Sequence, residues 1–329
     1  MEEGSCRGVK VIGKKKDDFT WLSERLDYLT KNDTFKSINS GNGKYISTFR
    51  AGAWTILKEM MIAYYSPSYI QILKNQSHID KVCYLDLFAG SGIVEIEGLS
   101  KYYLGSPLVV TKAIRNKFDE YFFFEKDEAK TKQLENLLAN EPATIIKGDS
   151  NVSIDGILKS ISSLRVHSLV FIDPFAMEIK FETIKKFAHV GCDFVITVAT
   201  EEIFRAVKQW FGNPSWNSTQ VNDFFGGEEW KSDLKNIHND EEIFNYYSDR
   251  VVNYAFKKKP KKTKIEKAIG GHHYYVLFTS TGGKGEQPKF FDIIDDFNRR
   301  IKNLSGDEIL NYLSHYVEGG GSSLRDFFA

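Results

Sequence analysis

Residues 84–92 read Tyr-Leu-Asp-Leu-Phe-Ala-Gly-Ser-Gly, and they constrain the fold more than any other part of the chain. A short apolar run ends at Asp86 and passes at once into a glycine-rich turn. A buried parallel strand that ends in a tight turn brings backbone close to a nucleotide-shaped ligand. Gly90 and Gly92 would let this backbone bend sharply with no Cβ in the way. Glycine-rich turns are widespread, so the meaning of this one depends on the strands that follow.

Three further strand patterns, at 121–125, 144–149 and 169–173, each end in an acidic residue. Helical patterns separate them, and a fifth strand pattern follows at 194–198. This alternation predicts an α/β fold, a Rossmann-like parallel sheet with helices on both faces. Because ligands bind outside the carboxyl ends of such strands, we expect four acids along one edge of the sheet. These acids are Asp86, Glu125, Asp149 and Asp173.

The ordered set of motifs resembles class I S-adenosylmethionine-dependent methyltransferases and, more closely, the family of three-Cys-motif partner proteins. The resemblance covers residues 44–200 well and 274–280 more loosely. It implies an S-adenosylmethionine-dependent methyltransferase. The alternative is a cofactor-binding partner subunit of a radical-SAM-type three-Cys-motif protein, with little catalysis of its own. The motifs that carry the resemblance lie at 85–92, 105–107, 124–125, 148–149 and 171–175.

The shape of S-adenosylmethionine suggests a role for each acid of the family pattern. Asp86 would receive the ammonium group, directly or through water, and Glu125 would accept both ribose hydroxyls. Asp149 would accept the adenine amino group. The alternative for each acid is that it only caps the helix after its strand. The predicted cofactor-binding residues are Asp86, Phe88, Ala89, Gly90, Ser91, Gly92, Glu125, Lys126, Asp149 and Ser150.

Two other nucleotide-binding motifs fit less well. A dinucleotide-binding fingerprint needs a third glycine after Gly90 and Gly92, followed by an acid about 20 residues on. The third glycine is missing, and Glu125 lies 33 residues past Gly92. A P-loop is also disfavoured, because no Gly-Lys-Ser/Thr closes the turn.

Asp173, Pro174 and Phe175 form the predicted catalytic corner. They resemble the Asp/Asn-Pro-Pro-Phe/Tyr element of methyltransferases that modify exocyclic amines, although the second proline is absent. The resemblance implies that Asp173 and a backbone carbonyl accept hydrogen bonds from the target nitrogen, while Phe175 stacks on the base. A similar Asp-Pro-Phe occurs in tRNA guanine N2-methyltransferases, which keeps an RNA base among the expected acceptors. The alternative is that Pro174 and Phe175 only end a strand.

Composition sets outer limits on partners and location. The 329 residues carry 44 basic and 44 acidic side chains, and a net charge of zero argues against a nucleic-acid footprint over the whole protein. A lysine run at 257–264, from Lys257 to Lys264, would either contact phosphates or form a solvated loop. Cys6, Cys83 and Cys192 are isolated, and no long apolar run or signal-peptide pattern is present. We therefore expect a cytoplasmic protein with no membrane span.

The chain divides into four predicted parts. Residues 1–43 form an extension with one short helix near Trp21, and 44–200 form the Rossmann-like core. The core begins with a long helix at about 49–74 that Pro67 should break or kink. Residues 201–264 form a helical insertion, and 265–329 return to the sheet and end in helices. His272 and His273 have no partners at metal spacing, so we interpret them as the start of a strand and predict no metal site.

Overall fold

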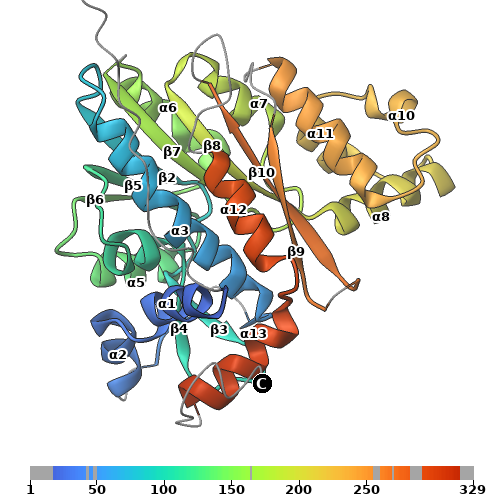
Figure 1. The fold of residues 1–329 in the computed structure, drawn as a ribbon. Coiled ribbons are helices and arrows are strands. Elements are labelled where there is room, and N and C mark those ends of the chain that lie inside the picture. Colours follow the sequence, from blue (N-terminus) through green and yellow to red (C-terminus); the bar gives the residue numbers. More distant parts are fainter. Residues whose placement is uncertain are drawn as a thin grey trace, which may run out of the picture.

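The computed structural model describes residues 18–41, 44–46, 50–163, 165–254, 260–268, 270–281 and 291–318. Seven strands form one sheet in the order β6-β5-β2-β7-β8-β10-β9 (Figure 1). β10 runs antiparallel to both of its neighbours, and the other pairs are parallel. The predicted α/β fold is confirmed. The strands are β2 (Lys81–Asp86), β5 (Glu120–Glu125), β6 (Ala143–Lys147), β7 (Val166–Ile172), β8 (Cys192–Val198), β9 (Lys261–Glu266) and β10 (His273–Ser280).

The order of the strands reverses at the boundary between β2 and β7. From β2 the chain first adds β5 and β6 on one side, and it then crosses over to add β7 and β8 on the other. In open α/β sheets, ligands bind in the crevice outside the carboxyl ends of the strands at such a reversal. Asp86 is the last residue of β2, and Asp173 directly follows β7. The topology therefore places the ends of both strands at the expected crevice.

Successive residues of each strand face opposite layers of helices. In β7, Leu169 and Phe171 join one core cluster, and Val170 and Ile172 join the other. Because both faces are covered, the central strands read as continuous apolar runs. The first cluster contains residues of α1 (Asp18–Thr30), α2 (Asp33–Ser40), α3 (Trp54–Lys74), α4 (Ser106–Leu108), α5 (Glu128–Leu137), α12 (Asp292–Ile301) and α13 (Gly306–Tyr312). The second contains residues of α6 (Ser150–Ile161), α7 (Phe181–Lys185), α8 (Thr200–Gly212), α9 (Thr219–Phe225), α10 (Trp230–Asp233) and α11 (Asp240–Tyr254).

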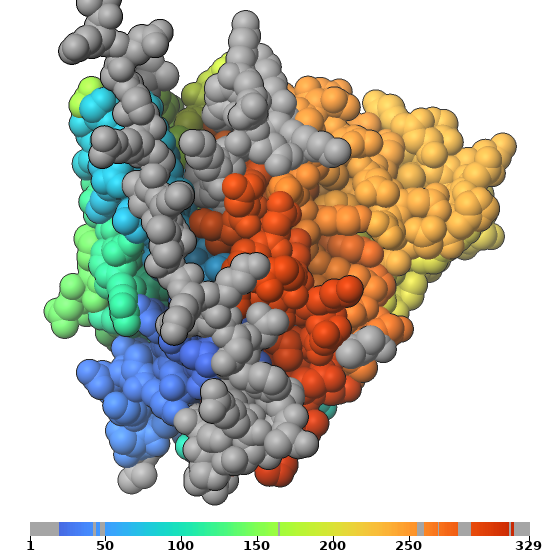
Figure 2. All heavy atoms as spheres, in the orientation of Figure 1, coloured from blue at the N-terminus to red at the C-terminus, as the bar shows by residue number. Residues whose placement is uncertain are grey.

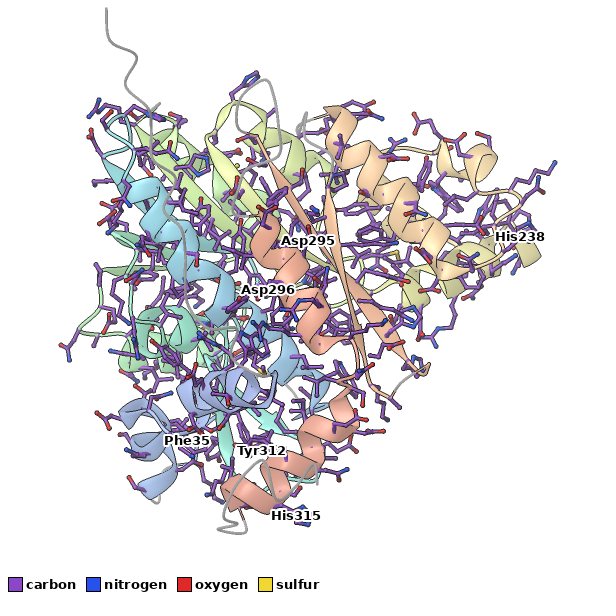
Figure 3. All side chains as sticks on the ribbon, viewed as in Figure 1. Phe35, His238, Asp295, Asp296, Tyr312 and His315 are labelled. Carbon is purple, nitrogen blue, oxygen red and sulfur yellow. The ribbon has the colours of Figure 1, made fainter. Side chains whose placement is uncertain are left out.

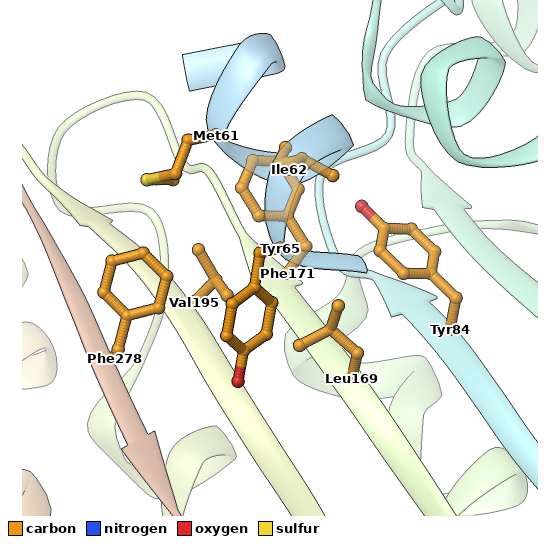
Figure 4. Close-up of a pocket in the computed structure, with 8 residues that line it drawn as sticks. All are labelled: Met61, Ile62, Tyr65, Tyr84, Leu169, Phe171, Val195 and Phe278. Atoms are coloured by element: carbon orange, nitrogen blue, oxygen red, sulfur yellow. The ribbon is translucent and has the colours of Figure 1, made fainter. Parts of the chain in front are cut away.

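Helix α3 lies across the face of the sheet and positions part of the site described below (Figure 1). Its residues Met61, Ile62 and Tyr65 surround a small apolar gap together with side chains of β2, β7, β8 and β10 (Figure 4). The helix begins at Trp54, later than predicted, and it runs through Pro67 to Lys74. Of the predicted break or kink at Pro67, the break is therefore wrong, since the packing of α3 on the sheet outweighs the hydrogen bond that the proline removes, and the kink stays a prediction.

Helices α8–α11 form one lobe at the side of the sheet, on the right in Figures 1 and 2. Their last residue is Tyr254, so the helical region ends earlier than the predicted 264. Residues 261–266 instead form the edge strand β9. Thr263 and Ile265 are buried, whereas Lys262 and Lys264 are exposed. The strand was missed because lysine occupies its outward positions and hides the two-residue period.

The remaining elements are short. The N-terminal part holds two helices, α1 and α2, where one was predicted, and the Asn32 side chain caps the second. Helix α7 continues into a 3-10 turn, η2 (Lys186–His189), and two π-helical turns are η1 (Val109–Ala113) and η4 (Leu313–Glu318). A separate small sheet contains β1 (Arg50–Ala51), β3 (Ile93–Ile96) and β4 (Tyr102–Leu104). Within the described ranges, no helix combines the length and apolarity needed to cross a bilayer.

Candidate active site

A cavity of about 970 Å³ opens at the carboxyl ends of the parallel strands. Its volume lies in the range of small-molecule and cofactor sites. Nine of the predicted site residues line it: Phe88, Gly90, Glu125, Lys126, Asp149, Ser150, Asp173, Pro174 and Phe175. Four do not line it: Asp86, Ala89, Ser91 and Gly92. The strand ends of β5, β6 and β7 thus supply one shared site.

The glycine-rich turn after β2 divides its residues between the cavity and the core. Gly90 lines the cavity with a φ of 64°, in the left-handed region that favours glycine. Gly92 also has a positive φ, of 77°, but it faces the core, where a Cβ would lie 3.0 Å from Leu134 Cδ1. The Ala89 N–H donates to the Phe124 carbonyl at 2.9 Å. This bond fixes the turn against β5.

Asp86 lies beneath the turn and is fully buried. Its Oδ1 accepts from the Phe88 N–H at 3.1 Å, and its Oδ2 accepts from the Ser106 hydroxyl at 2.7 Å. Burial raises the pKa of this carboxyl to about 7. Gly105 is the N-cap residue of α4, and the hydroxyl of Ser106, the first residue of this helix, donates to Asp86. Asp86 thus ties the turn to α4, and its contact with a ligand stays a prediction.

Glu125 and Asp149 differ in how the helix after each strand is capped. Glu125 Oε1 accepts from the Asp127 N–H at 2.8 Å, and it is Asp127 that caps α5. Asp149 caps α6, because its Oδ1 accepts from the backbone N–H of Asn151 at 2.9 Å. Both acids also line the cavity. Asp149 therefore both caps α6 and lines the cavity, whereas Glu125 lines the cavity without capping α5.

Asn151 and Glu178 brace the cavity wall, and sequence reasoning did not single them out. Asn151 Nδ2 donates to the Glu178 carbonyl at 3.0 Å, and Asn151 Oδ1 accepts from the Lys180 N–H at 2.9 Å. The Glu178 carboxylate accepts from Lys126 Nζ at 2.8 Å. These bonds connect the segments that follow β5, β6 and β7. In the sequence, only the polar residues after Asp149 pointed to Asn151, and the start of a capped helix would explain them equally well.

The corner after β7 presents an aromatic ring at the mouth of the cavity. Phe175 is 77% exposed although it lines the cavity. The next residue, Ala176, has a φ of 53°, a conformation uncommon for residues other than glycine. The left-handed residue turns the chain directly after Phe175. The ring is thus accessible at the cavity, and its binding role stays a prediction.

Lys58 is the site residue that sequence reasoning missed most clearly. It lines the cavity from α3, and its ammonium donates to Asp173 Oδ2. The side chain of Lys58 is only 7% exposed, and that of Asp173 is 22% exposed. The neighbouring Glu59 is also buried, and burial raises its pKa to about 8. A Lys-Glu pair on the buried part of an apolar helix was the available signal, because such residues are rarely buried without a partner.

Trp54 of α3 and Tyr274 of β10 also line the cavity, and the Tyr274 hydroxyl donates to the Trp54 carbonyl at 3.4 Å. His273 begins β10, as predicted, and its Nδ1 and Nε2 lie 3.2 and 2.9 Å from carboxylate oxygens of Glu201 and Asp240. These contacts connect the start of β10 to the lobe α8–α11. Among the described residues, no group of three or more His, Cys, Asp or Glu side chains is arranged to hold a metal ion.

The described lysines of the basic run are paired with acids. Lys261 contacts Asp295 at 2.6 Å, with Asp295 labelled on α12 in Figure 3, and Lys264 contacts Glu266 at 2.7 Å. Lys262 contacts Glu241 on α11. The first three lysines, at 257–259, lie outside the described residues. The interpretation of 261–264 as a loop is wrong, and the contact of the run with nucleic acid stays a prediction.

No protein-family model and no curated protein matches the chain. Solved structures resemble it only distantly. A Legionella pneumophila protein, LPL1258, is 15% identical, with 80% of this chain and 94% of that chain covered and a TM-score of 0.42. Trm1 from Pyrococcus horikoshii, solved with S-adenosyl-L-methionine, is 11% identical, with 84% and 81% covered and a TM-score of 0.43. The putative methyltransferase yhhF from Escherichia coli is 15% identical, with 69% and 86% covered and a TM-score of 0.31. Similarity at this level assigns no function to the chain.

Proposed function

We propose that this chain is an S-adenosylmethionine-dependent methyltransferase. One observation carries the proposal: Glu125, Asp149 and Asp173, which end or follow strands β5, β6 and β7, line a single cavity together with Gly90 of the turn after β2. Carboxylates at these strand ends match the ligand's hydroxyls and amines, which are hydrogen-bond donors. The sequence resemblance to class I methyltransferases points to the same ligand.

The residues present fit the cofactor. A volume of about 970 Å³ leaves room for a ligand of this size and for part of an acceptor. Glu125 would bind the ribose hydroxyls and Asp149 the adenine amino group, while the backbone at Gly90 allows close approach. When bound, S-adenosylmethionine would supply an activated methyl group. The protein's own residues would then act by binding and orientation, which can account for much of the rate of a group transfer.

The acceptor that we propose is an exocyclic amine on a nucleic-acid base. Asp173 would accept a hydrogen bond from the amine, and the exposed ring of Phe175 would stack on the base. The bonds from Asn151 and Glu178 would hold this corner in place relative to Glu125 and Asp149. A cytoplasmic location and a three-Cys-motif partner protein are further parts of the proposal, and both come from the sequence.

Two measurements test this function. Mass spectrometry of ligand that copurifies with the protein should find S-adenosylmethionine or its demethylated product. Transfer of labelled methyl groups should then be measured with tRNA, rRNA, DNA and protein as acceptors. Transfer to a nucleic-acid amine is the expected result. Binding of S-adenosylmethionine with no transfer to any acceptor would instead support a partner subunit, and a protein that binds no S-adenosylmethionine would contradict both.

A further inference from the structure

The wall of the cavity contains an ion pair, with a buried lysine and a partly buried aspartate, between two distant parts of the chain. Trp54 and Thr55 lie about one helical turn before Lys58 on α3, and all three line the cavity. The Lys58 ammonium donates to Asp173 Oδ2, one of the two oxygens of the carboxylate at the proposed catalytic corner. A single side chain on α3 thus determines which oxygen of Asp173 is engaged.

Stability alone gives a weak reason for this pair. Removing an ammonium and a carboxylate from water is costly, and replacing such a pair by apolar side chains is often neutral or stabilising. Most other lysine–carboxylate pairs of the described residues are more exposed: in the pair of Lys81 with Glu120, for example, the side chains are 51% and 40% exposed. The Lys58–Asp173 pair is the more costly arrangement, and it lies in the cavity wall.

We propose that Lys58 is the positioning residue for Asp173: it holds Oδ2 and leaves Oδ1 directed at the acceptor amine. The inference rests on the proposed methyltransferase function and goes beyond it, because it assigns a role to a residue of α3. An ammonium restricts the rotation of a carboxylate through a short, charge-assisted hydrogen bond. Pro174 restricts the backbone of the same corner through its fixed φ. Asp173 would thus be held from both its side chain and its main chain.

The pair also lies within a small cluster of buried charges. The pKa of Glu59 is raised mainly by burial, while Lys58 opposes that rise and Asp173 and Asp86 add to it. Glu59 Oε2 has no hydrogen-bond partner among the described residues. Loss of the Lys58 charge would remove the cation that contacts Asp173 beside two further buried carboxyl groups, so we expect Asp173 to change position when Lys58 is neutralised.

Crystal structures of the wild type and of Lys58→Met, each with S-adenosylhomocysteine, test the positioning directly. We expect Lys58 to contact Asp173 in the wild type, and the Asp173 carboxylate to leave that position in the variant. A Lys58 ammonium turned away from Asp173 in the wild type would overturn the proposal, and so would an Asp173 that keeps its place in Lys58→Met. This arm requires no known acceptor. Should Lys58→Met fail to fold, Lys58→Leu, which likewise lacks a hydrogen-bond donor, serves for the same comparison.

Steady-state kinetics give the second arm, with the acceptor that the transfer assay of the proposed function identifies. We expect Lys58→Met to lower kcat by on the order of 100-fold with KM and S-adenosylmethionine affinity nearly unchanged, since small misplacements of reacting groups have effects of this size. Lys58→Arg should recover part of kcat, because it keeps the positive charge. Lys81→Met is the matched control, a paired lysine outside the cavity, and should behave as the wild type. Unchanged kcat in Lys58→Met, or a loss of S-adenosylmethionine affinity equal to the loss of kcat, would overturn the proposal. A wild type that binds no S-adenosylmethionine would instead refute the proposed function.

Discussion

The ammonium of Lys58 contacts the carboxylate of Asp173, although 115 residues separate them in the chain. Lys58 belongs to α3, which covers one face of the sheet, and Asp173 follows β7 at the edge where Glu125 and Asp149 also lie. The covering helix therefore contributes directly to the cavity. This contact connects α3, which precedes β2 in the chain, with the corner after β7 that we propose to be catalytic.

Because Asp173 is proposed to contact the acceptor, replacing it should lower methyl transfer without lowering S-adenosylmethionine affinity. Asp173→Ala should abolish methyl transfer and leave S-adenosylmethionine affinity nearly intact, because the carboxylate is proposed to face the acceptor. Asp155→Ala is a suitable control, since Asp155 is an exposed acid of α6 paired with Lys186. Calorimetry and a transfer assay measure the two quantities. Transfer at the wild-type rate in Asp173→Ala would show that this role is wrong.

The exposure of Phe175 predicts a loss of acceptor binding with no loss of stability. Phe175→Ala should change the free energy of unfolding by no more than about 0.5 kcal/mol, because the ring is 77% exposed. It should weaken binding of a base by roughly 1–3 kcal/mol, the usual contribution of stacking. Phe175→Leu keeps an apolar side chain without a ring and should behave like the alanine variant. Wild-type acceptor affinity in Phe175→Leu would exclude stacking.

Glu59 predicts a pH dependence of stability. Its pKa is raised from 4.5 to about 8 by burial, so the folded protein keeps this proton over a range in which the unfolded chain has released it. The unfolded state then binds fewer protons, and stability falls as pH rises through that range, by at most about 1.4 kcal/mol per pH unit. Glu59→Gln should remove this contribution. Urea unfolding at pH 5, 6, 7 and 8 compares the two proteins. A difference in stability that is constant with pH would contradict the shift.

The lysine run predicts different effects for its two halves. Replacing Lys261, Lys262 and Lys264 by Ser should reduce stability modestly, since exposed ion pairs contribute about 0.2–1 kcal/mol each. It should leave the salt dependence of tRNA binding unchanged, because these ammonium groups already contact carboxylates. Replacing Lys257, Lys258 and Lys259 should reduce that dependence if phosphates bind there, through the loss of counterion release. Equal salt slopes for wild type and both triple variants would leave the run without a role in nucleic-acid binding.

The sequence predicted the parts of the structure that depend on local pattern. Apolar runs with acids at their ends indicated β2, β5, β6 and β7, and the rule that ligands bind at carboxyl ends placed Glu125, Asp149 and Asp173 together. It failed where a contact between distant segments decides the structure. β9 was hidden because its outward side chains are lysines, and α3 continues through Pro67 because its packing on the sheet holds it. Lys58 could not be assigned to Asp173, since no spacing rule relates residues so far apart.

Calorimetric titration of the purified protein with S-adenosylmethionine tests the central claim most directly, with Glu125→Ala as the variant and Glu128→Ala as the control. Glu128 is an exposed acid at the start of α5, three residues from Glu125. We predict binding by the wild type and by Glu128→Ala. We predict a loss of a few kcal/mol in Glu125→Ala, because two hydrogen bonds to a charged group contribute roughly 1.5–3 kcal/mol each. Equal affinity in wild type and Glu125→Ala, or tighter binding of NAD than of S-adenosylmethionine, would contradict the account.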